Sequence, residues 1–101
     1  MADTSLAWQG STLSLSGPLT YATVQGLLQS IDAKTIAKHG LDTVDLSSVS
    51  RVDSAGLALL VELWRLRQES DGGEGAGLRF AGLPAEIRPM LALYDLEEIL
   101  L

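Results

Sequence analysis

Polar and apolar residues alternate over residues 12–16, the pattern of a strand with one buried face. A second short strand is predicted over residues 6–9, a few positions earlier in the chain. We expect these two strands to pair as an antiparallel hairpin that ends at Gly17 and Pro18.

In three other segments apolar residues recur every three to four positions, which is the spacing of an amphipathic helix. The first helix is predicted over residues 20–36, capped by its first residue, with Gly40 in the left-handed conformation that ends the helical region. The second and clearest covers residues 53–70. The third opens with Pro84 in a first-turn position, and Pro89 should kink it or shift its start.

Short strands at residues 44–47 and 78–81 separate these helices, and the glycine-rich residues 71–77 are expected to form a flexible loop. The predicted order is therefore β-β-α-β-α-β-α. Strands that alternate with helices favour a sheet containing parallel pairs, with helices packed on it. We expect an α/β fold with a mixed sheet of about four strands, in a single domain over residues 1–101, because 101 residues are too few for two domains.

The helix over residues 53–70 is apolar around more of its circumference than one buried face needs. Its apolar side chains spread over roughly 220° of a helical wheel, whereas a surface helix uses a stripe a little over 100° wide. Either the helix is buried between the sheet and neighbouring helices, or part of this arc meets a partner protein. The arc comprises Leu57, Leu59, Leu60, Val61, Leu63, Trp64 and Leu66.

The remaining stripe of this helix is polar, and its N-terminal end carries unusually small side chains. This polar stripe consists of Ser54, Ala58, Glu62, Arg65 and Glu69. Small side chains let the backbone of another protein approach closely, while flanking residues can supply an anchor and polar contacts. We therefore predict that this stripe docks onto a protein partner. The predicted contact residues are Asp53, Ser54, Ala55, Ala58, Val61, Glu62 and Arg65.

Asp53 and Ser54 have both a structural and a functional interpretation. Asp53 is a preferred N-cap residue that would accept a hydrogen bond from an unpaired amide, with Ser54 as the first helical residue. Alternatively, the Ser54 hydroxyl is exposed at a helix N-terminus, where free N–H groups and the helix dipole favour a phosphate. The neighbouring Asp53 carboxylate and the net charge of −6 oppose a phosphate there.

Composition argues against several classes of function. The 13 acidic residues outnumber the 7 basic ones and no basic cluster is present, which disfavours binding to nucleic acid or to anionic lipid. There is no cysteine and only one histidine, His39, so neither a catalytic triad nor a transition-metal site is expected. The Gly-x-Gly within residues 71–77 joins a helix to a strand, unlike a phosphate-binding loop. We expect no enzymatic activity, no cofactor and no metal.

No targeting or membrane-spanning segment is evident in the sequence. Residues 1–5 have neither the basic nor the apolar region of a signal peptide. The longest apolar runs fall far short of the ~20 residues that a membrane span needs. We expect a cytoplasmic protein with no direct membrane insertion.

Residues 44–60, with the sequence VDLSSVSRVDSAGLALL, resemble the signature of the STAS domain family. In that family a short strand ending in Asp-Leu-Ser precedes Asp-Ser/Thr-x-Gly-Leu at the start of a helix. The resemblance covers roughly residues 6–96 and implies an STAS-like fold. Within the family, residues 50–60 and 91–96 are most similar to a subunit of bacterial phospholipid-trafficking ABC transporters.

This resemblance implies a non-catalytic subunit that binds the cytoplasmic ATPase and supports its assembly and activity. Such complexes move phospholipid between the inner and outer membranes and maintain the lipid asymmetry of the outer membrane. In another branch of the family the position matching Ser54 is phosphorylated by a serine kinase, which releases an anti-sigma factor.

An anti-sigma-factor antagonist switched at Ser54 is therefore the alternative function, and a small-ligand or nucleotide-binding domain is a third. Antagonists often carry a second hydroxyl residue where this chain has Ala55, which favours the transporter subunit.

Overall fold

A four-stranded mixed sheet forms the centre of the molecule, as predicted, with the strands in the order β1-β2-β3-β4. β1 and β2 are an antiparallel hairpin, whereas β3 is parallel to β2 and β4 is parallel to β3. The α/β fold class is therefore confirmed. The computed structural model describes residues 4–70 and 78–93, so the predicted loop at 71–77 lies outside the described residues. The strands are β1 (Ser5–Gln9), β2 (Thr12–Leu19), β3 (Thr43–Val52) and β4 (Arg79–Ala81).

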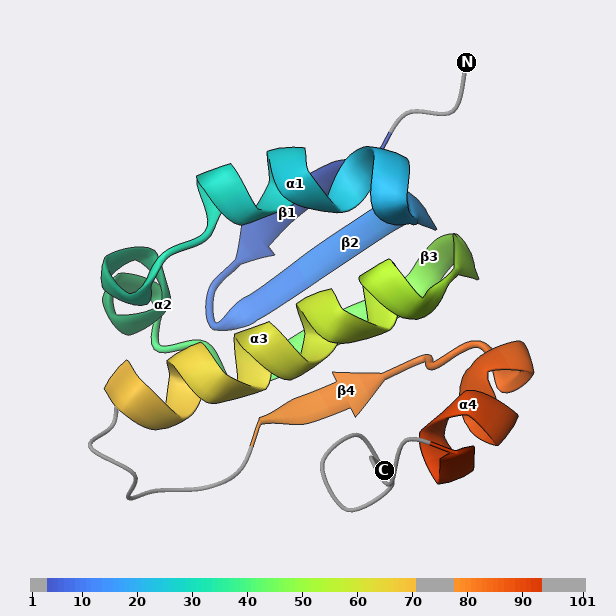
Figure 1. Ribbon diagram of the computed structural model, residues 1–101. Coiled ribbons are helices and arrows are strands. Elements are labelled where there is room, and N and C mark those ends of the chain that lie inside the picture. The colour runs from blue at the N-terminus through green and yellow to red at the C-terminus, as the bar shows by residue number, and fades with distance from the viewer. Residues whose placement is uncertain (1–3, 71–77, 94–101) are drawn as a thin grey trace.

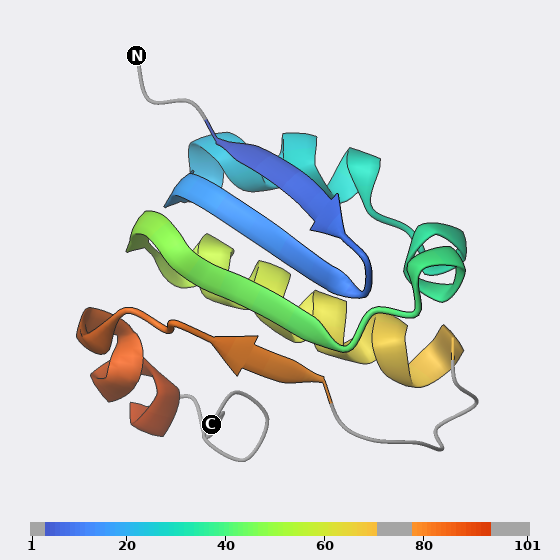
Figure 2. The ribbon, with the colours of Figure 1, turned by 180° about the vertical axis from the view of Figure 1, so that it is seen from behind.

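In the described part of the chain, helices pack on one face of the sheet and leave the opposite face uncovered (Figures 1 and 2). α1 and α3 lie side by side across the covered face, and both begin at the same end of the molecule, on the right in Figure 1. α2 lies at the opposite end, and α4 follows β4. The helices are α1 (Tyr21–Ser30), α2 (Ala33–His39), α3 (Ser54–Ser70) and α4 (Arg88–Leu93), the last preceded by the 3-10 turn η1 (Ala85–Ile87).

The core lies between the sheet and the helices because alternate residues of the central strands point toward the helices. Leu13 and Leu15 of β2 and Val44 and Leu46 of β3 are buried in this way. The intervening residues, such as Ser14 and the others of the open face, remain half-buried or exposed. The main contributions from α1, α2 and α3 are Val24, Leu27, Ile36, Leu57, Leu59, Leu60 and Leu63.

β2 does not end at Gly17 and Pro18, and the sequence-based boundary is therefore wrong. Both residues lie inside the strand, which continues to Leu19 and pairs there with β3. Proline lacks an N–H group and is tolerated in strands mainly at edges and bulges. The β2–β3 register shifts between Gly17 and Pro18, and the register with β1 stops at Ser16, so the ladder is already irregular at this point.

The first predicted helix is two helices, because Ile31 and Asp32 interrupt it. Ile31 adopts an extended conformation and is buried in the core, which removes it from the helical path. Asp32 then caps α2, its Oδ1 accepting a hydrogen bond from the Thr35 amide at 2.8 Å. The predicted cap at Thr20 and the left-handed Gly40 (φ 61°) are both confirmed.

Two further boundaries differ from the sequence-based expectation. β3 runs on through the polar residues that follow Ser47 as far as Val52, because the end of β2 supplies it with a parallel partner. The third helix was expected to open at Pro84, but α4 begins at Arg88. Pro89 lies in its first turn, so of the two effects expected of this proline, the structure shows a shifted helix start and not a kink. The helical spacing of this segment also includes Tyr94, which lies outside the described residues.

Gly56, in the first turn of α3, lets the backbone of this helix come into direct contact with the backbone at the end of β2. A Cβ atom on Gly56 would lie 2.1 Å from the carbonyl oxygen of Leu19 and 2.9 Å from its carbonyl carbon. That same carbonyl accepts a hydrogen bond from the Asp53 amide at 3.2 Å. The position therefore requires glycine, and it fixes where α3 begins relative to the sheet.

We predict that Gly56→Ala lowers the free energy of unfolding by about 1–3 kcal/mol or more, because the added methyl group forces α3 away from the backbone of β2. Gly26→Ala in α1 is the matched control, since nothing lies within 4 Å of its added Cβ. That variant should gain about 0.5–1 kcal/mol from higher helix propensity. Urea denaturation of both variants measures the two changes, and equal effects would contradict the close approach.

Candidate protein-docking site

The carboxylate of Asp53 joins the N-termini of α1 and α3. Its Oδ1 accepts a hydrogen bond from the Gly56 amide at 3.0 Å, which makes Asp53 the N-cap of α3 as predicted. Its Oδ2 accepts a hydrogen bond from the amide of Tyr21, the first residue of α1, also at 3.0 Å. One side chain therefore satisfies an unpaired amide in each of two helices.

These contacts favour the ionised form of Asp53. The hydrogen bonds from the Tyr21 and Gly56 amides lower the pKa of its carboxyl below the ordinary value, and the positive charge of Arg51 adds to the effect. The positive N-terminal ends of the α1 and α3 dipoles are thus already compensated by the negative charge of Asp53. A phosphate on Ser54 would meet that charge at close range, because Ser54 is the next residue in the chain.

The polar stripe of α3 faces away from the core, as expected. Ser54, Ala58 and Arg65 are exposed, and Ala55 and Glu62 are half-buried. Asp53 and Val61 are half-buried as well. Ser54 and Ala58 lie one turn apart, so a surface with little side-chain bulk runs along the first turns of the helix.

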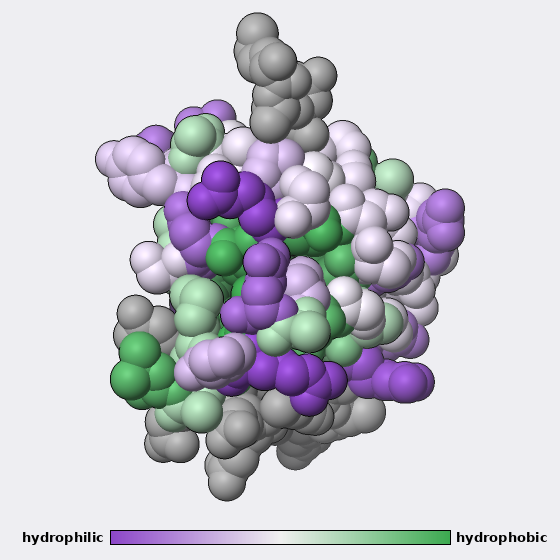
Figure 3. Space-filling model, turned by 90° about the vertical axis from the view of Figure 1, so that its right-hand side faces the viewer, coloured by the Kyte–Doolittle hydropathy of each residue, from purple (hydrophilic) through white to green (hydrophobic). Residues whose placement is uncertain are grey.

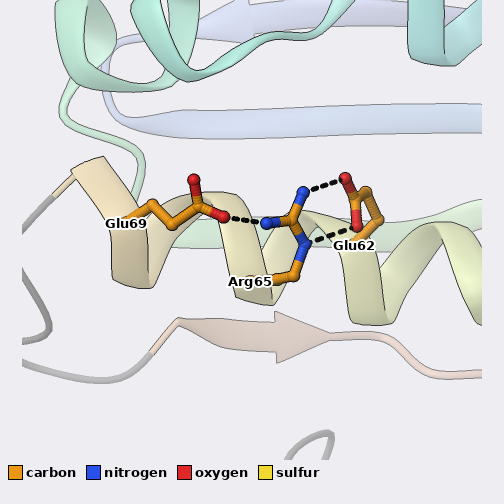
Figure 4. Close-up of polar contacts among 3 residues, drawn as sticks. All are labelled: Glu62, Arg65 and Glu69. Atoms are coloured by element: carbon orange, nitrogen blue, oxygen red, sulfur yellow. Dashed lines mark hydrogen bonds and ion pairs between the residues drawn. The ribbon is translucent and has the colours of Figure 1, made fainter.

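Arg65 is held by carboxylates of its own helix (Figure 4). Its Nε donates to Glu62 Oε1 at 2.8 Å and its Nη2 to Glu62 Oε2 at 2.6 Å, while its Nη1 pairs with Glu69. The hydrogen bonds from Arg65 lower the pKa of Glu62. A partner that uses Arg65 must therefore share or replace these carboxylates, and the three side chains together carry a net negative charge.

The wide apolar arc of α3 is explained chiefly by burial. Its members Leu57, Leu59, Leu60 and Leu63 are buried in the common core, and the partly buried Trp64 and Leu66 pack against that core. The sheet, α1 and α2 together surround more of the helix than a sheet alone would. The docking prediction therefore rests on the polar stripe and not on the arc.

A shallow apolar groove beside this stripe was not found from the sequence. It lies between α1 and the start of α3, has a volume of about 400 Å³, and is bordered on the α3 side by Ala55. Tyr21 at its edge is 85% exposed and Leu28 is 37% exposed. Periodicity alone places Leu28 in the core, because it follows Leu27 within an apolar run. The groove is lined by Tyr21, Val24, Gln25, Leu28 and Ala55.

Figure 3 faces the end of the molecule where α1 and α3 begin, and apolar side chains show there between polar ones.

No helix within residues 4–70 and 78–93 combines the length and hydropathy that crossing a bilayer requires. Over the same ranges, no three His, Cys, Asp or Glu side chains are placed to hold a metal ion. His39 stacks on Trp8, with ring centroids 4.0 Å apart, and so has a structural role.

A mixed four-stranded sheet, with an Asp-Ser pair opening the helix that follows β3, agrees with the STAS-like fold that the sequence resemblance implied. The chain belongs to the STAS domain family, since a family model described as the MlaB STAS domain matches residues 3–101. A curated relative from Escherichia coli K12, the intermembrane phospholipid transport system binding protein MlaB, is 36% identical over 94 residues, covering 91% of this chain and 90% of the relative. The MlaB protein of Shigella flexneri matches to the same extent.

Solved structures share the fold at lower sequence identity. The anti-sigma factor antagonist SpoIIAA in its unphosphorylated form matches with a TM-score of 0.65 and 18% identity, over 98% of this chain and 86% of that protein. An anti-sigma factor antagonist from Mycobacterium paratuberculosis gives a TM-score of 0.60 and 22% identity, over 99% of this chain and 83% of that protein. These similarities establish the STAS-like fold.

We predict that Asp53→Asn lowers the free energy of unfolding by about 1–2 kcal/mol at neutral pH, since a neutral amide has one acceptor oxygen for two backbone donors. Folding lowers the pKa of Asp53, so its stabilising contribution is present above the unfolded value, about 3.9, and is lost as the pH falls through the lower folded value. The difference between wild type and variant should therefore shrink below about pH 4.

Asp32→Asn is the matched control for this prediction. Both hydrogen bonds that Asp32 accepts from Thr35 end on the single atom Oδ1, which an asparagine oxygen can replace. Thermal unfolding between neutral and acidic pH should show a smaller loss for Asp32→Asn than for Asp53→Asn. Equal losses would contradict the role of Asp53 in holding two helices.

Proposed function

We propose that this chain is a non-catalytic subunit of a phospholipid-transport ABC complex, in which it binds the ATPase subunit and supports its assembly and activity. The complex would maintain the lipid asymmetry of the outer membrane. The chain would act on the cytoplasmic side, held at the inner membrane through its partner. The observation that carries this proposal is the 36% identity to MlaB proteins over 91% of the chain.

The geometry of α3 supports docking through its polar stripe. Ser54 and Ala58 are exposed on consecutive turns and offer a surface that a partner backbone can approach closely. Asp53 and Gly56 fix this surface relative to the sheet, so the site is preorganised, which lowers the entropic cost of binding. Val61, Glu62 and Arg65 extend the proposed contact along the same helix.

The exposure of Ser54 also favours the second candidate, an anti-sigma-factor antagonist that a serine kinase switches by phosphorylation. The solved antagonists share the fold, and a hydroxyl at the first position of a helix is accessible to a kinase. The adjacent Asp53 carboxylate opposes a phosphate at this position by like-charge repulsion. The family signature places an aspartate before this serine in both branches, so we rank the antagonist below the transporter subunit on sequence identity, which is 36% to the MlaB proteins and 18–22% to the solved antagonists.

Ala58→Arg should abolish binding to the ATPase while leaving the fold intact. Ala58 is exposed, and arginine has nearly the helix propensity of alanine, so the thermal unfolding midpoint should change little. In the complex the substitution buries an unpaired charge, at a cost of about 2–5 kcal/mol. The expected loss of affinity is roughly 30-fold or more, measured by calorimetric titration with the purified ATPase subunit.

Ala37→Arg is the matched control, because Ala37 is an exposed alanine in α2, at the other end of the molecule from the start of α3. It should bind the ATPase with wild-type affinity. If Ala58→Arg unfolds the chain, the outward orientation of this stripe is wrong. If it folds and binds as well as the control, docking does not use the stripe.

Ser54→Ala should retain the fold, because Asp53 still caps α3, and should weaken binding to the ATPase only modestly. An antagonist would behave differently, because loss of the hydroxyl would leave it permanently able to bind the anti-sigma factor. A reporter gene under control of the sigma factor distinguishes the two. Constitutive reporter expression in the Ser54→Ala strain would favour the antagonist over the transporter subunit.

A further inference from the structure

α1 differs from the other helices of the described part of the chain because it has no charged residue. α2 carries two lysines, α3 the Glu62–Arg65–Glu69 group, η1 Glu86 and α4 Arg88. Exposed helix faces in water normally carry charged side chains. The outer face of α1 instead exposes Tyr21 and Leu28 in a chain with 13 acidic and 7 basic residues.

This uncharged face is continuous with the proposed docking stripe. The groove that Tyr21 and Leu28 border is closed on the α3 side by Ala55, the residue between Ser54 and Gly56. The Asp53 carboxylate, which binds the Tyr21 amide, holds the two helices in this arrangement. Tyr21 is already positioned by its backbone, so its exposed side chain contributes little to the fold.

Resting on the proposed function, we propose that the docking surface extends from α3 onto α1, and that the groove receives a large apolar side chain of the ATPase partner. Tyrosine and uncharged, apolar surroundings are typical of the centre of a protein interface, where charged residues are depleted. Tyr21 and Leu28 would then be anchors, while the exposed small residues of α3 allow the two backbones to close together.

Charge distinguishes a protein occupant from the other candidates. Anionic lipid is attracted by clusters of basic residues, and the five residues that line the groove include none. A second copy of this chain would bring another net charge of −6. The acidic Glu62 and Glu69 lie farther along α3, so the complementary partner surface is apolar opposite the groove and uncharged or basic beyond it.

The test compares Tyr21→Gln and Leu28→Gln with Leu93→Gln, which removes an exposed leucine side chain from α4 (76% exposed, close to the 85% of Tyr21). Each full-length variant is titrated with the purified ATPase subunit, and its unfolding midpoint is measured. We expect native-like unfolding for all three. Tyr21→Gln and Leu28→Gln should each lose ~10-fold or more in affinity, whereas Leu93→Gln should bind like the wild type.

The groove proposal is overturned if both groove variants bind the ATPase normally while Ala58→Arg does not, a result that leaves the α3 docking proposal intact. If Leu28→Gln is poorly folded, benzoylphenylalanine in place of Tyr21 supplies an independent readout, and light-induced cross-linking to the ATPase is expected. Cross-linking to another copy of the chain instead, or to phosphatidylglycerol vesicles, would overturn the protein occupant. Failure of the wild-type chain to bind the ATPase would overturn both proposals.

Discussion

The Asp53 carboxylate is the interaction on which the rest of the site depends. Two helices that are far apart in sequence begin at the same end of the sheet, and each leaves amides without intrahelical partners. Asp53 accepts one hydrogen bond from each helix, and its negative charge lies where both helix dipoles are positive. The absence of a side chain at Gly56 allows α3 to come close enough to β2 for this arrangement.

The polar stripe is available to a partner because the other sides of α3 are fully used. Leucines on the inner side fill the core with the sheet, and Trp64 and Leu66 pack at its margin. The stripe itself is divided into an uncharged start around Ser54 and Ala58 and a charged continuation, where Arg65 is bound by Glu62 and Glu69. A partner therefore meets small side chains first and acidic ones farther along.

The same arrangement of Asp53, Ser54 and the start of α3 suits both candidate functions, the docking subunit and the phosphorylation-switched antagonist. In a docking subunit, a fixed and small-sided helix start gives shape complementarity without chemistry. In an antagonist, the exposed hydroxyl at that start adds a position where charge can be introduced. In either case Ser54 directly follows Asp53, whose carboxylate accepts hydrogen bonds from both helices, so a phosphate on Ser54 would place negative charge beside the group that organises the site.

The sequence by itself determined the elements whose signals are local. Alternation specified the hairpin, helical periodicity and the Asp-Ser motif specified α3 with its cap, and the small-sided stripe followed from the helical wheel. Local rules failed where the tertiary partner decided the outcome: β2 continues through Pro18 because β3 pairs with it, and burial of Ile31 separates α1 from α2.

Only the tertiary structure brought Tyr21 and Leu28 next to Ala55, since a groove between helices depends on their packing and not on the spacing within either one. The second hydrogen bond of Asp53 has the same origin. Its donor lies 32 residues away in the sequence, and it reaches the carboxylate only because α1 and α3 pack side by side on one sheet.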